Sequence, residues 1–156
     1  MGLWERLIGA GSVEEQDTRR VLPELQKSYG EEVRLARQIR EHADHAPHQA
    51  GAQGLRAIAE EQDRLAQLLR DKIVALGEEV SDQVAPLRGG KNHWARVVRD
   101  LEENQALGRH YNEQAIYWEP DLPDIVVLYR TLEQEKNRIN ALLRDIALRA
   151  DPHALD

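Results

Sequence analysis

The chain has 156 residues, a formal net charge of −7 and no cysteine. This length suits one domain with a single core, and the lack of cysteine excludes disulfides, thiolate metal sites and cysteine nucleophiles. The acidic balance argues against nucleic-acid binding, which needs a concentrated basic surface. No apolar run approaches the roughly 20 residues of a membrane-spanning helix. We therefore expect a cytoplasmic protein with no integral membrane segment.

The composition predicts an all-α protein. Leu, Ala, Arg, Glu and Gln dominate, Phe is absent, and no stretch alternates between apolar and polar residues as a strand does. The chain opens with an amphipathic leader over residues 1–11. We expect it to dock on the bundle or on a neighbouring subunit, with a weak membrane-surface anchor as the alternative.

Four long amphipathic helices follow, at about residues 13–46, 52–80, 92–118 and 124–149. Pro47, the Gly89–Gly90 pair and the turn 119–124 separate them, and a tail at 152–156 closes the chain. Connections this short favour antiparallel neighbours. Residues 12–151 are thus expected to form one antiparallel four-helix bundle.

A twelve-residue phrase occurs twice, at residues 60–71 and 134–145, with a spacing of 74 residues. Both copies carry a Glu followed three residues later by an Arg, and both end in LLRD. Residues three apart share a helix face, so Glu61 pairs with Arg64 and Glu135 with Arg138. The repeat predicts that the second and fourth helices are related by a pseudo-twofold axis.

Three passages resemble the ferritin-like family, especially its rubrerythrin and bacterioferritin branch. They are SYGEEVRLARQI in the first helix, IAEEQDRLAQLL in the second and LEQEKNRINALL in the fourth. The resemblance implies two iron or manganese ions held by a Glu on helices one and three and a Glu-x-x-His on helices two and four. The matching positions are Glu31 or Glu32, Glu61, Glu102 and Glu135, with Glu32 the better candidate.

The chain departs from that pattern at both histidine positions, which are Arg64 and Arg138. Arginine has no lone pair for a metal, and its guanidinium pairs with carboxylates instead. We therefore expect Glu61–Arg64 and Glu135–Arg138 ion pairs in place of the metal centre, and no cofactor. The simpler interpretation is that both are ordinary surface pairs.

Three functions remain open. The first is a non-catalytic bundle that acts as a homo-oligomer, most simply a dimer, or binds a protein partner, with Tyr117 and Trp118 as candidate contacts. The second is an iron or manganese carboxylate protein for storage or oxidation. The third is a small-ligand carrier whose interior presents Gln105, Asn112 and Lys136.

A histidine cluster at the end of the first helix has two interpretations. His42 and His45 are one turn apart and could share a zinc ion with Glu41 or His48. Histidines near a helix C-terminus also complement the helix dipole. Because no second element supplies further ligands, we expect the capping role.

Overall fold

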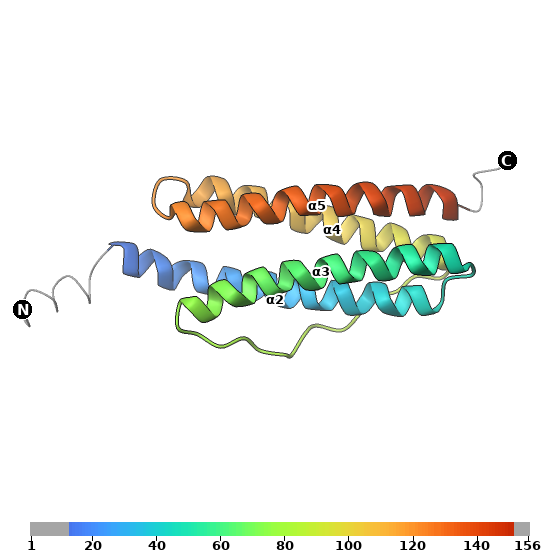
Figure 1. Cartoon of the computed structure of the whole chain (residues 1–156), viewed down its shortest axis with the longest axis horizontal. Helices are drawn as coiled ribbons and strands as arrows, with labels where there is room; N and C mark the ends of the chain where they lie inside the picture. The colour runs from blue at the N-terminus through green and yellow to red at the C-terminus, as the bar shows by residue number, and fades with distance from the viewer. Residues whose placement is uncertain (1–12, 152–156) are drawn as a thin grey trace, which may run out of the picture.

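The computed structural model describes residues 13–151, and four long helices account for most of them (Figure 1). They are α2 (Val13–Asp44), α3 (Gln49–Ala75), α4 (His93–Trp118) and α5 (Pro123–Ala150). The predicted leader at 1–11 and tail at 152–156 lie outside the described residues. None of the described helices is long and apolar enough to cross a membrane.

Each helix end lies within about three residues of its predicted position except the end of α3, which is at Ala75 rather than near residue 80. Gly77 has a φ of 90°, a left-handed conformation that glycine adopts at little cost. The amide of Glu78 bonds back to the carbonyl of Ile73, which closes the helix as a Schellman motif does. The glycine therefore ends the helix before the predicted bound.

The helices form two antiparallel hairpins that pack against each other. α2 packs mainly on α3, and α4 mainly on α5, while α2·α4 and α3·α5 make the contacts between the hairpins. Going around the bundle, the order is therefore α2, α3, α5, α4. This arrangement confirms the predicted all-α four-helix bundle with antiparallel pairs.

The connection between the hairpins is longer than the sequence suggested. Residues 76–92 contain no helix and run back along the outside of α2, so that α3 and α4 point in the same direction (Figure 1). Polar contacts hold this segment in place: Gln26 Nε2 donates to the Glu79 carbonyl at 2.8 Å, and the Arg88 amide donates to Gln38 Oε1 at 2.8 Å. The expectation of short connections throughout is wrong for this segment.

The buried positions of α3 and α5 repeat at the spacing of the duplicated phrase. Leu55, Ile58, Leu65 and Leu69 are buried in α3, and the residues 74 positions later, Tyr129, Leu132, Ile139 and Leu143, are buried in α5. The same relation pairs Gln62 with Lys136. The repeat thus reflects equivalent packing in the two hairpins.

Candidate functional site

The middle of the core holds one polar side chain from each helix: Glu32, Gln62, Asn104 and Lys136. All four are fully buried. The Lys136 ammonium donates to a Glu32 carboxylate oxygen and, at 2.8 Å, to Asn104 Oδ1. Gln62 Nε2 donates to the same Asn104 oxygen at 2.7 Å. We call these four residues the central layer.

Burial dominates the electrostatics of the central layer. It raises the pKa of Glu32 and lowers the pKa of Lys136, while the attraction between the two groups opposes both shifts. Tyr111 is also fully buried, and its pKa is raised well above the usual value, first by burial and then by the nearby Glu32. Each charge in this layer thus depends on its partner for compensation.

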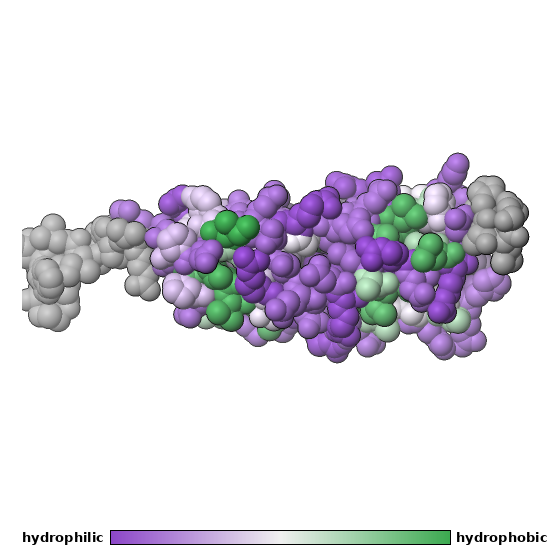
Figure 2. Space-filling view, turned by 90° about the horizontal axis from the view of Figure 1, so that it is seen from above, coloured by the Kyte–Doolittle hydropathy of each residue, from purple (hydrophilic) through white to green (hydrophobic). Residues whose placement is uncertain are grey.

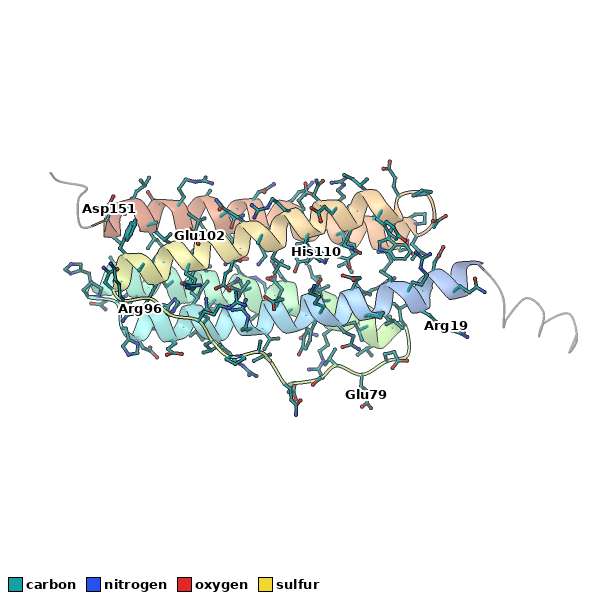
Figure 3. The ribbon with its side chains drawn as sticks, turned by 180° about the vertical axis from the view of Figure 1, so that it is seen from behind. Arg19, Glu79, Arg96, Glu102, His110 and Asp151 are labelled. Carbon is teal, nitrogen blue, oxygen red and sulfur yellow. The ribbon has the colours of Figure 1, made fainter. Side chains whose placement is uncertain are left out.

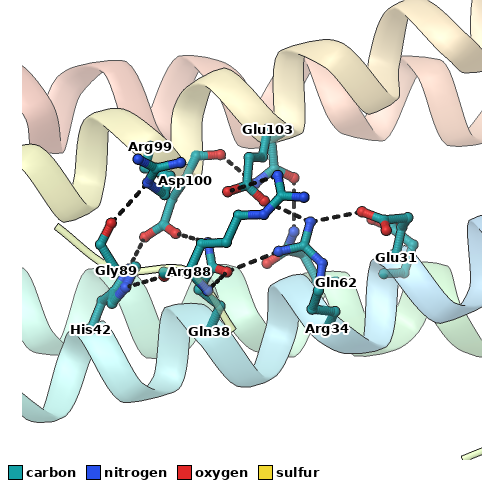
Figure 4. A network of polar contacts seen from close by, with 12 residues as sticks. Glu31, Arg34, Gln38, His42, Gln62, Arg88, Gly89, Arg99, Asp100 and Glu103 are labelled. Carbon is teal, nitrogen blue, oxygen red and sulfur yellow. Dashed lines mark hydrogen bonds and ion pairs between the residues drawn. The ribbon is translucent and has the colours of Figure 1, made fainter. Parts of the chain in front are cut away.

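A second group of polar residues continues from Asn104 toward the end of the bundle where α2 ends (Figure 4). Asn104 Nδ2 donates to the backbone carbonyl of Asp100 at 2.8 Å. The Asp100 carboxylate is fully buried, accepts from Gln38 Nε2 at 2.8 Å, and lies 2.6 Å from His42 Nδ1. His42 Nε2 lies 3.1 Å from the Arg88 carbonyl. This polar group therefore also holds the connection between the hairpins, residues 76–92, which we call the crossing segment.

Both ring nitrogens of His42 face an acceptor, the Asp100 carboxylate and the Arg88 carbonyl. Burial raises the pKa of Asp100 above its usual range, and the contacts with His42 and Gln38 oppose this shift. His45 is exposed and its Nδ1 lies 2.9 Å from the Glu41 carbonyl. His42 is thus a buried residue in the last turn of α2 that contacts α4, whereas His45 contacts a carbonyl of its own helix end, in line with the expected capping role.

Arg34 joins the network from its other side. It is 2% exposed and lies between two carboxylates, at 2.7 Å from Glu31 and 2.6 Å from Glu103. Its guanidinium also donates to Gln38 Oε1 at 2.9 Å. A charged side chain in this position is compensated by two acids and an amide, as burial of a guanidinium requires.

The four residues of the duplicated motif form a chain of ion pairs on the outer face where α3 and α5 meet. Arg64 contacts Glu61, Arg138 lies 3.0 Å from Glu135, and Arg138 also reaches Glu61 at 2.8 Å. The side chains of Arg64 and Arg138 are 64% and 54% exposed. These pairs connect the hairpins at the surface, outside the central layer.

Exposed ion pairs contribute little to stability, because water and salt screen them. We expect Arg138→Ala to leave the midpoint of urea denaturation at its wild-type value, at both low and high salt. A clear loss of stability that disappears at high salt would contradict this, and would mean that the pairs on this face hold the hairpins together.

The predicted carboxylate quartet does not come together. Glu32 is in the core, Glu61 and Glu135 lie at the half-exposed face, and Glu102 is exposed on α4 (labelled in Figure 3). Within residues 13–151 no group of three or more His, Asp or Glu side chains is arranged to hold a metal ion. The central layer offers a single carboxylate beside an ammonium, which is a poor ligand set for two divalent cations.

Lys136 was expected in the interior and is buried there, whereas Gln62, the residue after the predicted Glu61, was not expected. Gln62 lies between the buried Ile58 and Leu65, and Lys136 between the buried Leu132 and Ile139, at the three- and four-residue steps of the core stripe. The apolar spacing alone places residues 62 and 136 inward, one position after the predicted Glu61 and Glu135.

The residues expected to line an interior ligand cavity are also separated. Lys136 is in the core, but Gln105 and Asn112 line an open polar groove on the outer surface of α4 and α5, together with Arg109 and Arg144. In α4 the buried polar side chains are Asp100, Asn104 and Tyr111 instead. The bundle interior is filled at mid-height by the central layer.

Comparisons of the chain with protein-family models, curated proteins and solved structures find no match. The fold and the core therefore define the class directly. The protein is an all-α bundle of two antiparallel helical hairpins, with a buried polar network between them.

Proposed function

We propose that the protein is a non-catalytic bundle of ferritin-like architecture, with an ion pair in place of a metal centre, that acts through its surface as a homodimer. The observation that carries the proposal is the fully buried Lys136 ammonium, bonded to Glu32 and Asn104 where side chains from all four helices meet. A protonated lysine neutralises the buried carboxylate, as a cation bound there would.

The topology supports the ferritin-like part of this proposal. Ferritin-like bundles have two antiparallel hairpins joined by one long crossover connection, and residues 76–92 are such a connection. In that family the metal ligands project inward from all four helices. The central layer is likewise made of one inward-facing side chain from each helix, but the chemical groups are different.

Elemental analysis tests the loss of the metal. After expression in medium supplemented with iron and manganese, we expect the purified chain to carry far less than one metal ion per molecule. About two ions per chain would overturn the proposal and restore the iron or manganese protein, since the di-metal sites of this class hold a pair. Lys136→Glu is the matched variant, because it supplies a second buried carboxylate in the same layer.

The proposed dimer contact is the apolar patch of Ile116 and Val127 near the α4–α5 turn, with side chains 55% and 65% exposed. Arg130 donates to Asn112 across the hairpin at 2.8 Å, and each lies one turn from a patch residue, which places Ile116 and Val127 at the same level of the hairpin. Figure 2 shows apolar surface as islands toward the two ends of the molecule, with a polar region between them.

A second copy is the occupant that best suits this patch. Glu113 and Asp124 lie one turn from the patch residues and are exposed, and Arg130 supplies the opposite charge beside Val127. An apolar centre with both signs of charge at its border is self-complementary under a twofold axis.

Sedimentation velocity over a dilution series tests the dimer. We expect the wild type to sediment as a dimer that dissociates on dilution, and Ile116→Glu to sediment as a monomer. Val74→Glu is the matched control, because Val74 is also 55% exposed but lies on α3, in the other hairpin. A wild type that is monomeric at every concentration, or a dimer that survives Ile116→Glu, would refute this contact.

A further inference from the structure

A cavity of about 420 Å³ lies at the end of the bundle where α3 and α4 begin and α5 ends. This is the right-hand end in Figure 1. Trp94, Ile146, Ala50 and Ala150 supply its apolar lining. The cavity is separate from the central layer, because the lining residues include none of those four core positions.

The charged and polar groups around this cavity are basic. His48, His93 and Arg149 line it, and none of the ten described lining residues is acidic, although the whole chain carries a net charge of −7. Arg149 lies 3.2 Å from Asp145 in a pair whose side chains are 80% and 57% exposed. Such an exposed pair is weak, so the guanidinium remains available to a ligand.

Two helix N-termini add to the positive potential. His48 is the N-cap of α3 and makes no side-chain capping bond, whereas Asn92, the N-cap of α4, accepts from the Ala95 amide at 2.7 Å. Neither helix has an acidic residue in its first turn, so no side chain of the helix itself neutralises the positive end of the dipole. His93, at the start of α4, has its Nδ1 closed to solvent and without a hydrogen-bond partner among the described residues, while its Nε2 lies on the side of Gly51, another lining residue.

From this arrangement we propose that the cavity binds a small carboxylate with an apolar, ring-sized body. The carboxylate lies among His48, His93 and Arg149, where charge-assisted hydrogen bonds are available. The apolar body packs on Trp94 and Ile146, and a volume of this size suits a small organic molecule.

Binding by this site depends on pH in a defined direction. Burial, followed by the charges of Arg96, His42 and His48, lowers the pKa of His93, and only Asp100 opposes this. His93 is therefore neutral in the free protein at neutral pH, and a bound carboxylate favours its protonated form. The dissociation constant is expected to fall as the pH is lowered from about 8 to about 6.

Isothermal titration calorimetry of the full chain with naphthalene-2-carboxylate tests the proposal. The uncharged naphthalene-2-carboxamide is the control ligand, and we expect it to bind at least about tenfold more weakly. Arg149→Gln should weaken carboxylate binding several-fold, whereas Arg144→Gln, on the same helix but outside this cavity, should not. Ala50→Trp should abolish binding by filling the cavity.

No binding of the carboxylate, equal binding of the carboxamide, or full binding by Ala50→Trp would overturn the proposal. Circular dichroism confirms that each variant is folded. Binding by a chain ending at Asp151, but not by the full chain, would also overturn it, because the cavity would then belong to residues 152–156 of the chain itself.

Discussion

Lys136→Met is expected to lower the free energy of unfolding by about 3–5 kcal/mol, the cost of leaving one partner of a buried ion pair uncompensated. Glu32 and Lys136 are both fully buried, so water cannot replace the missing ammonium around the carboxylate. Asn104 also loses one of its donors. Urea denaturation of the variant, followed by circular dichroism, measures the loss.

The double variant Glu32→Leu plus Lys136→Met is the control for this prediction. Replacement of a whole buried ion pair by apolar residues of similar volume is often neutral or stabilising. We therefore expect the double variant to be at least as stable as the more stable of the single variants Glu32→Leu and Lys136→Met. It should recover most of the free energy of unfolding that Lys136→Met loses. A Lys136→Met protein as stable as the wild type would mean that the pair is not excluded from water.

The second large effect is expected for Asp100→Ala, which should lower the free energy of unfolding by about 3 kcal/mol. The change removes the acceptor of both Gln38 and His42, and buried donors without a partner are costly. Because Gln38 and His42 also hold Arg88, the crossing segment loses part of its attachment. The rate of hydrogen exchange of the amides in residues 76–92 should therefore increase, in addition to the loss of stability.

Glu102→Ala is the matched control for Asp100→Ala, since Glu102 is an acid on the same helix but exposed. We expect it to change neither stability nor exchange in the crossing segment. If Asp100→Ala lowers stability and leaves exchange in residues 76–92 unchanged, the network stabilises the helices but does not anchor the segment.

The network has a structural consequence that an apolar core lacks. Its direct side-chain bonds Glu32–Lys136, Gln62–Asn104 and Gln38–Asp100 each join one hairpin to the other. Apolar contacts between helices tolerate sliding, whereas buried polar groups are satisfied at one register only. The polar core thus selects one alignment of the two hairpins, and the surface chain through Arg138 follows it.

Helix content and the number and extent of helices follow from local physics that a sequence carries directly. Propensity and three- and four-residue apolar spacing placed the four helices, and the spacing of 74 residues predicted the equivalence of α3 and α5. The burial of Glu32 was also visible, because it lies in the middle of an apolar stripe.

Only the tertiary structure decided which polar residues meet, because this depends on how the helices are rotated and aligned. A rotation of one residue on a helix, about 100°, separates Glu61 from the buried Gln62 and Glu135 from the buried Lys136. Asp100 and His42 are 58 residues apart in the chain, and their contact needs the long crossing segment that aligns α4 with α2. Local sequence patterns define the faces of helices, but the pairing of those faces is a property of the whole fold.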